Sequence, residues 1–200
     1  MSSSTLLDRD DAAWRELRRD PVFPWLSDTQ QGEYIAGAVA IGREQAGCFQ
    51  GKQVRSLAVQ LGARVLIVDD GGAEGDKGTA GDKPPPYNVM DGCVAGVPIF
   101  AEYDAGSRLI TVYRFGIKAV ARLLECADAE RIALDLLIAH ELFHHLEATR
   151  IGPVPDRLPP IFVPMFWGLF RARRRVRSTS EIAAQAFAQA LIGLTLPLAA

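Results

Sequence analysis

The stretch DLLIAHELFHHLEATR, residues 135–150, contains the pattern H-E-x-x-H and predicts both a helix and a metal site. On a helix, residues four apart lie on the same face, with side-chain bases about 6 Å apart. His140 and His144 can therefore hold one metal ion between them. Glu141 follows the first histidine and is placed to act on water bound to that metal. Imidazole ligands and an open position for water are typical of catalytic Zn²⁺, so the pattern predicts zinc.

The surroundings of the pattern support this interpretation over that of two histidines that merely pack or face solvent. Apolar residues keep helical spacing, and no Gly or Pro occurs between Asp128 and Arg150. All 3 histidines of the chain fall within this stretch. His145 points about 100° away from His144 around the helix, so no histidine remains for a third ligand. The third protein ligand must be a carboxylate or, less favourably, a cysteine.

A second helix, predicted over residues 178–196, offers that carboxylate. Either Ser178 or Ser180 can cap it. Its body is apolar except for one polar stripe at a spacing of four, formed by Glu181, Gln185 and Gln189. Because a polar stripe on a buried helix usually faces something specific, we expect it to face the metal.

Glu181 is the preferred third ligand, and it would complete a His₂Glu site with an open position. Glu147 and Asp156 are its rivals for this place. Glu147 lies on the same helix as the histidines and would reach the metal poorly. Without a metal role, Glu181 would be an acidic residue that the helix dipole favours at a helix start.

Composition sets the broad class of protein. The 200 residues are 48% hydrophobic and 23% charged, which suits one globular domain over residues 1–200. The net charge of −2 gives no general attraction to nucleic acid or membrane. Three separated cysteines and a polar N-terminal stretch without a signal-peptide core favour a cytoplasmic location.

The rest of the chain predicts an α+β fold, in which a helical bundle carries the metal beside a small, mostly antiparallel sheet. Further helices are expected at residues 8–20, 27–48, 52–61 and 116–126. Strands are expected at residues 64–69, 97–103 and 108–113, and the last two should form an antiparallel hairpin.

Two segments resist assignment to this core. Residues 71–92 hold glycines and consecutive prolines and predict a flexible surface loop. Residues 153–177 are an insertion rich in proline, apolar residues and arginine. Within it, residues 161–170 are too short to span a bilayer and should form core or a groove wall, although a membrane surface is an alternative. The basic run Arg171 to Arg177 is either a solvated linker or a contact for an anionic partner, nucleic acid or lipid headgroup.

Three blocks of the chain resemble the ImmA/IrrE-type zinc metallopeptidases, a zincin-like family. The first block is L-A-x-x-L-G at residues 57–62, followed by the strand at residues 64–68. The second is the H-E-x-x-H helix, residues 140–144. The third is similar to the family's E-x-x-A-N-x-F-A-x-x-L-L helix and covers residues 181–192, with Gln185 in place of the usual Asn. The blocks keep the family's order along the chain.

The resemblance implies a zincin-like fold, with His140, His144 and Glu181 as zinc ligands and Glu141 as general base. It implies a peptidase that cleaves cytosolic regulatory proteins, so a protein or peptide substrate is expected. The alternative is a binding or regulatory module that keeps this scaffold with little or no peptidase activity. Phe143, where family members often carry Gly, should narrow access to the metal.

The stabilising group for the oxyanion stays open among three residues. Peptide hydrolysis needs a hydrogen-bond donor for the tetrahedral oxyanion in addition to the metal. Tyr103, Tyr113 and Arg177 carry suitable donors, and the sequence does not choose among them.

Overall fold

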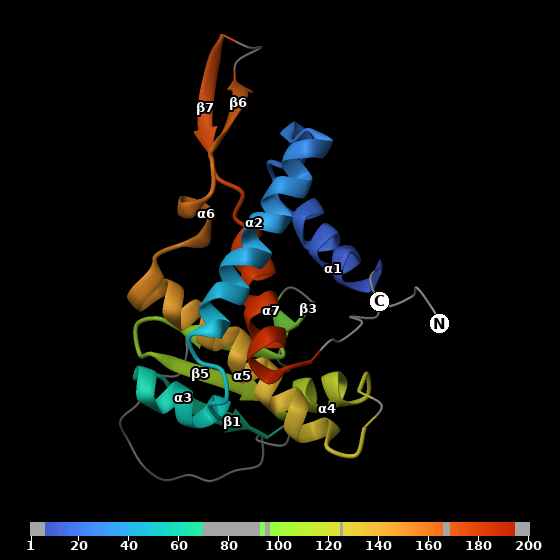
Figure 1. The fold of residues 1–200 in the computed structure, drawn as a ribbon, viewed down its shortest axis with the longest axis vertical. Coiled ribbons are helices and arrows are strands. Elements are labelled where there is room, and N and C mark those ends of the chain that lie inside the picture. Colours follow the sequence, from blue (N-terminus) through green and yellow to red (C-terminus); the bar gives the residue numbers. More distant parts are fainter. Residues whose placement is uncertain (1–6, 70–92, 95–96, 125, 166–168, 195–200) are drawn as a thin grey trace.

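The computed structural model describes residues 7–69, 93–94, 97–124, 126–165 and 169–194 (Figure 1). This part of the chain is a mixed α+β structure, mostly helical, with small sheets. The predicted loop 71–92 lies outside the described residues. The helices are α1 (Leu7–Arg18), α2 (Asp28–Gly47), α3 (Val54–Leu61), α4 (Arg114–Ala121), α5 (Ala129–Leu146), α6 (Val154–Arg157) and α7 (Thr179–Ile192). The strands are β1 (Arg64–Val68), β2 (Cys93–Val94), β3 (Val97–Pro98), β4 (Ala101–Asp104), β5 (Leu109–Tyr113), β6 (Ile161–Met165) and β7 (Phe170–Arg174).

The largest sheet has three strands in the order β1-β5-β4. The predicted hairpin is present as β4 and β5, which pair antiparallel with Ala101 opposite Val112. It is shorter than expected, because Val97–Pro98 pairs with β2 instead. β1 runs parallel to β5, so the sheet is mixed rather than mostly antiparallel. A long connection separates these two strands, and no tight turn forces them to be antiparallel.

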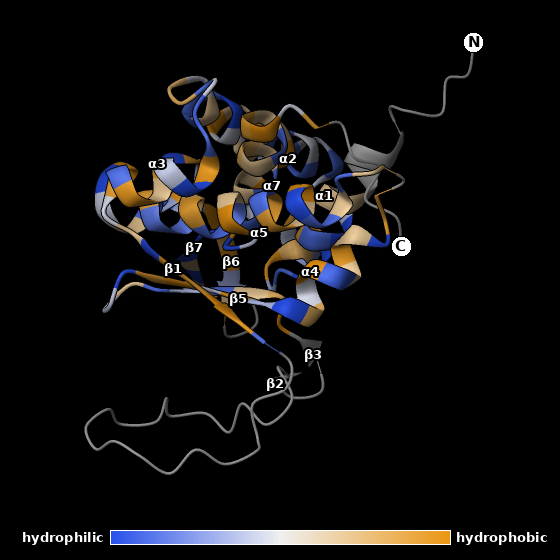
Figure 2. Ribbon diagram, turned by 90° about the horizontal axis from the view of Figure 1, so that it is seen from below, coloured by the Kyte–Doolittle hydropathy of each residue, from blue (hydrophilic) through white to orange (hydrophobic). Residues whose placement is uncertain are grey.

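Helix α5, which carries the H-E-x-x-H pattern, lies in the middle of the described structure (Figure 1). It contacts β4 and β5 on one side and α7 on the other, and α7 packs in turn on α2. Figure 2 shows the three-stranded sheet as a layer beneath the helices. Ile110 and Val112 of β5 and Ile138 and Leu142 of α5 are fully buried in the resulting core. This layering fixes α5 between a sheet and a second helix.

The close packing of α2 on α7 depends on Gly42. A Cβ atom built on Gly42 would lie 2.2 Å from the carbonyl oxygen of Ala183, which is closer than real atoms approach. Ala183 and Ala184 of α7 are fully buried. Small side chains on both helices therefore allow their backbones to approach each other.

Several predicted helix ends are confirmed and others are wrong. α7 ends at Ile192, before the predicted residue 196, because Gly193 adopts a left-handed conformation with φ 68°. Ser27 caps α2 in a reciprocal arrangement with Gln30, and Gly62 ends α3 with φ 86°. α4 begins at Arg114 and ends at Ala121, earlier than the predicted 116–126. The α-helical part of α5 ends at Leu146, and a wider π-type turn over Glu147–Ile151 follows.

The segment that follows α6 is a β-hairpin, which the sequence pattern did not predict. β6 and β7 pair antiparallel and stand out from the helical body at one end of the molecule (Figure 1). Ile161 and Val163 are buried, but Phe162 is 60% exposed, so the expectation of core or groove wall holds for only part of the segment. The arginines up to Arg174 belong to β7 and are not a linker.

None of the helices that the structure describes combines the length and the apolar character that a membrane crossing requires.

Candidate metal centre

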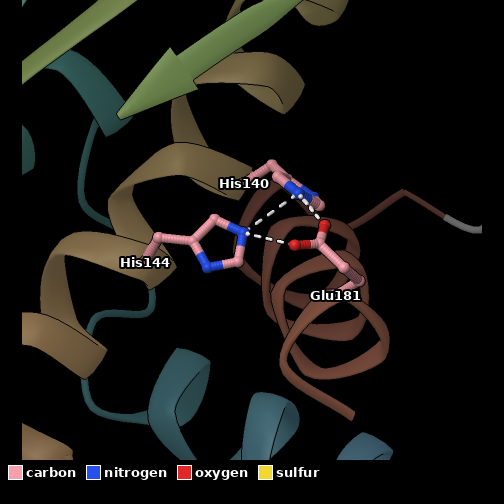
Figure 3. A group of neighbouring side chains, drawn as sticks. All are labelled: His140, His144 and Glu181. Carbon is pink, nitrogen blue, oxygen red and sulfur yellow. Dashed lines mark hydrogen bonds and ion pairs between the residues drawn. The ribbon is translucent and has the colours of Figure 1, made fainter. Parts of the chain in front are cut away.

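α5 and α7 bring His140, His144 and Glu181 together, as Figure 3 shows. The Nε2 atom of His140 lies 3.1 Å from one carboxylate oxygen of Glu181. The Nε2 atom of His144 lies 3.4 Å from the other oxygen and 3.4 Å from Nε2 of His140. Taking one ligand atom from each residue, all three atoms lie within 4.8 Å of one another.

These distances suit a small tetrahedral cation. Zn²⁺ with ligand bonds of about 2.0–2.1 Å separates neighbouring ligand atoms by about 3.3 Å. The two histidine nitrogens are 3.4 Å apart, close to this separation. Two imidazoles and a carboxylate are also a donor set that zinc accepts in catalytic sites. The residues therefore fit the ion that the H-E-x-x-H pattern predicted.

Helix geometry explains why the histidines meet. His140 and His144 are four residues apart on α5, which places both rings on the face that meets the first turn of α7. The side chain of Glu181 is 47% exposed and that of His140 is 28% exposed. The group is thus open to solvent on one side, where water or a substrate can reach it.

Glu147 holds the opposite edge of the His144 ring. One carboxylate oxygen lies 3.0 Å from Nδ1 of His144. The other accepts hydrogen bonds from the backbone N–H of Val154 at 2.8 Å and the hydroxyl of Ser180 at 2.6 Å. A carboxylate at Nδ1 keeps the proton there and leaves the Nε2 lone pair for a metal. Glu147 is therefore placed behind a ligand, not among the donors.

Asp156, which the sequence offered as a rival third ligand, is engaged in an ion pair with Arg175. Among the described residues, no group of three histidine, cysteine or acidic side chains other than His140, His144 and Glu181 is arranged to hold a metal. Asp156 is therefore not a member of the metal group.

The start of α7 is held differently from the predicted serine cap. The hydroxyl of Ser180 donates to Glu147, and the side chain of Ser178 makes no cap bond. Instead, the buried carboxylate of Asp20 accepts a hydrogen bond from the backbone N–H of Ser178 at 2.9 Å. A residue far away in the sequence thus fixes the helix end that carries Glu181.

The carboxylates of Glu147 and Glu181 and the ring of His144 shift one another's pKa values. Burial lowers the pKa of His144, but hydrogen bonds to Glu147 and Glu181 outweigh that effect and raise it to about 10. Hydrogen bonds from His140 and His144 hold the pKa of Glu181 well below its usual range. The site is thus rich in negative charge around two imidazoles, which favours a cation.

Glu141 lies beside this group on α5. Its side chain is nearly buried, and burial raises the pKa of its carboxyl, while His140 and His144 partly oppose that rise. Among the described residues, no side chain or backbone group forms a hydrogen bond with this carboxyl. A carboxylate of raised basicity with no protein donor is suited to accept a proton from water.

His145 is directed away from the metal face, as predicted. It is fully buried, with Nε2 3.0 Å from the carbonyl oxygen of Leu61 and Nδ1 2.9 Å from the hydroxyl of Tyr103. The hydroxyl of Tyr113 donates to Glu102 at 2.6 Å. Two of the three candidate oxyanion donors thus already have protein partners.

Phe143 does not narrow the site. The side chain is fully buried and packs against Phe187 of α7, with ring centroids 5.4 Å apart. The expectation that it would restrict access is wrong, because it lies on the face of α5 that packs into the core. Phe143 instead helps to hold α5 against α7.

A cavity of about 530 Å³ adjoins the metal group. His140 and Glu181 form part of its wall, and Gln185 and Gln189 continue it along α7. The predicted polar stripe is therefore divided: Glu181 meets the histidines, and the two glutamines face the cavity. The sequence pattern did not single out the apolar part of the wall, formed by Phe100, Val120, Leu123, Leu124, Leu136 and Leu137. The apolar residues on α4, directly after α4 and on α5 could have indicated most of this wall.

Neither Tyr103, Tyr113 nor Arg177 belongs to the lining of this cavity. Arg177 lines a different cavity, next to the β6–β7 hairpin. Chemically, the site offers three ligands for one cation, a buried carboxylate beside them and an apolar space for part of a substrate.

No family model, curated protein or solved structure matches this chain.

Proposed function

We propose that this chain is a zinc-dependent metallopeptidase that hydrolyses peptide bonds of a cytosolic protein, of the regulatory kind that the ImmA/IrrE resemblance implies. The observation that carries the proposal is the meeting of His140, His144 and Glu181 beside the nearly buried Glu141. Binding a metal needs only the first three residues. A carboxylate at position 141 has a use in hydrolysis, which favours an enzyme over a metal-binding scaffold.

The residues have distinct tasks in this chemistry. His140, His144 and Glu181 would hold Zn²⁺, which when bound lowers the pKa of water toward about 7 and polarises the scissile carbonyl. Glu141 accepts the proton of the attacking water and passes it to the leaving amine. Glu147 keeps the His144 ring in place through its 3.0 Å contact with Nδ1.

The surroundings of the site suit an extended peptide. β4 is a terminal strand of the three-stranded sheet and lies against α5. An extended peptide can pair with such a strand through main-chain hydrogen bonds. Phe100, just before β4, lines the cavity beside His140. A peptide on β4 would therefore pass the metal group and place an apolar side chain in the cavity.

The test incubates a peptide library with the parent chain or with the Glu141→Gln variant. Mass spectrometry then measures the peptide termini that cleavage creates. We expect the parent to create new termini only with zinc present, and Glu141→Gln to lose at least about 100-fold in rate while keeping its zinc. Equal cleavage by both chains would show that Glu141 is not the base. Zinc-loaded parent without any cleavage would favour the second candidate.

That second candidate is a zincin-like binding or regulatory module with little or no peptidase activity. It is favoured by the hydroxyls of Tyr103 and Tyr113, which are held by His145 and Glu102 and do not line the cavity. A peptidase needs an oxyanion donor in addition to the metal. In this case, zinc would bind without any turnover.

A further inference from the structure

The β6–β7 hairpin carries exposed apolar side chains far from the metal centre. Phe162 on β6 is 60% exposed. Where β7 begins, Leu169 and Phe170 are 76% and 67% exposed. Single apolar residues on a surface are ordinary, but several on one narrow ribbon indicate an interaction site. Figure 1 shows the ribbon standing clear of the helices, so a flat partner can reach it.

The same hairpin also carries several positive charges. Among the described residues, no carboxylate lies within ion-pair distance of Arg171, Arg173 or Arg174, nor of Arg177 after the strand. The next arginine along, Arg175, is paired with Asp156. The whole chain has a net charge of −2, so the positive charge of this hairpin is a local property and not one of the whole chain.

The register of the hairpin mixes the two kinds of side chain. Phe162 lies opposite Arg173, and Pro164 lies opposite Arg171. Directly paired residues of an antiparallel ribbon project from the same face. An apolar ring and guanidinium groups are therefore presented together on one exposed face.

A second cavity, of about 860 Å³, lies at the base of the hairpin. Arg173, Arg174 and Arg177 line it, together with Trp25, which is 51% exposed. Its acidic residues are already engaged. Asp20 accepts hydrogen bonds from the backbone N–H groups of Val22 and Ser178, and Asp156 is paired with Arg175. The cavity has room and positive charge for a phosphate group.

We propose that the β6–β7 hairpin docks this chain on the surface of a membrane that contains anionic phospholipids. Phe162 and Leu169 enter the boundary between headgroups and acyl chains, and the arginines contact lipid phosphates. A lipid surface is favoured over nucleic acid because it alone matches both properties: nucleic acid satisfies the arginines but leaves the aliphatic Leu169 in water. Apolar burial combined with attraction to anionic lipid is the usual basis of peripheral membrane binding.

The experiment is cosedimentation of the full chain with phosphatidylcholine vesicles, with and without phosphatidylglycerol. We expect binding to the phosphatidylglycerol vesicles and little to pure phosphatidylcholine. The double variant Phe162→Ser/Leu169→Ser should lose at least about tenfold in binding. Val59→Ser is the matched control, because Val59 is 71% exposed on α3 and should not affect binding.

A second pair of substitutions separates the contributions. Arg171→Gln/Arg173→Gln removes two cations from the exposed face and should reduce the preference for phosphatidylglycerol. The proposal is overturned if the parent does not bind the anionic vesicles, or if the serine variant binds them as the parent does. A different result would assign the surface to nucleic acid instead. In that case only the glutamine variant loses binding to the vesicles, and duplex DNA displaces the parent chain from them. Zinc content and circular dichroism of each variant report folding independently.

Discussion

The two carboxylates around His144 contact different nitrogens of the same ring. Glu181 lies 3.4 Å from Nε2, and Glu147 lies 3.0 Å from Nδ1. Only the Nε2 side also faces His140. Glu181 therefore belongs to the group of possible ligands, and Glu147 positions one of them.

Glu147→Ala tests this division at the scale of the residue. Loss of the contact to Nδ1 frees the ring and its tautomer, so zinc affinity should fall about 10- to 100-fold. The measurement is a competition titration with a chromophoric zinc chelator. Glu130→Gln, an exposed change on the same helix, is the control and should leave affinity unchanged. A Glu147→Ala chain that bound zinc like the parent would contradict the positioning role.

The sequence predicted the meeting of His140, His144 and Glu181 because local rules place each one. Helical spacing fixes the two histidines, and the polar stripe on α7 identifies Glu181. The role of Glu147 could not be predicted in the same way. It depends on hydrogen bonds from Val154 and Ser180, which come from later segments, and on the π-type turn that begins at Glu147.

At the scale of the element, the position of Glu181 depends on how α7 packs against α2. Gly42→Ala should push these helices apart, because the added methyl meets the backbone of Ala183, two residues from Glu181. We expect a loss of about 1–3 kcal/mol in the free energy of unfolding and weaker zinc binding.

Gly32→Ala, on the same helix, is the matched control for this substitution. A Cβ atom at Gly32 meets nothing within 4 Å. The change should stabilise α2 by about 0.5–1 kcal/mol and leave zinc affinity intact. Chemical denaturation and zinc titration of both variants check the pair. Equal stability and equal zinc affinity of the two variants would show that the contact between α2 and α7 does not determine the position of Glu181.

The β6–β7 hairpin could not be predicted from its sequence pattern. Apolar side chains lie on both faces of β6, since Phe162 is exposed while Ile161 and Val163 are buried. The alternation that identifies a strand is therefore missing. Pro164 also argues against a strand, although a two-stranded ribbon tolerates it because each strand has a free edge. Long-range pairing, which sequence spacing does not encode, decides this element.

At the scale of the whole molecule, the buried apolar side chains form one cluster that spans the sheet and the helices from α1 to α7. One cluster predicts one cooperative unfolding transition. Urea unfolding of the chain in a chelator, followed by circular dichroism and by tryptophan fluorescence, should give coincident midpoints. Two separate midpoints would contradict the single domain expected over residues 1–200.

We propose above all that α5 and α7 together build a zinc site from His140, His144 and Glu181. Elemental analysis of the purified parent chain beside Glu181→Ala tests it most directly. We predict about one zinc per parent chain and a strong loss in the variant, since two histidines alone remain. A parent that took up no zinc when offered it, or a Glu181→Ala chain that held as much as the parent, would contradict the claim.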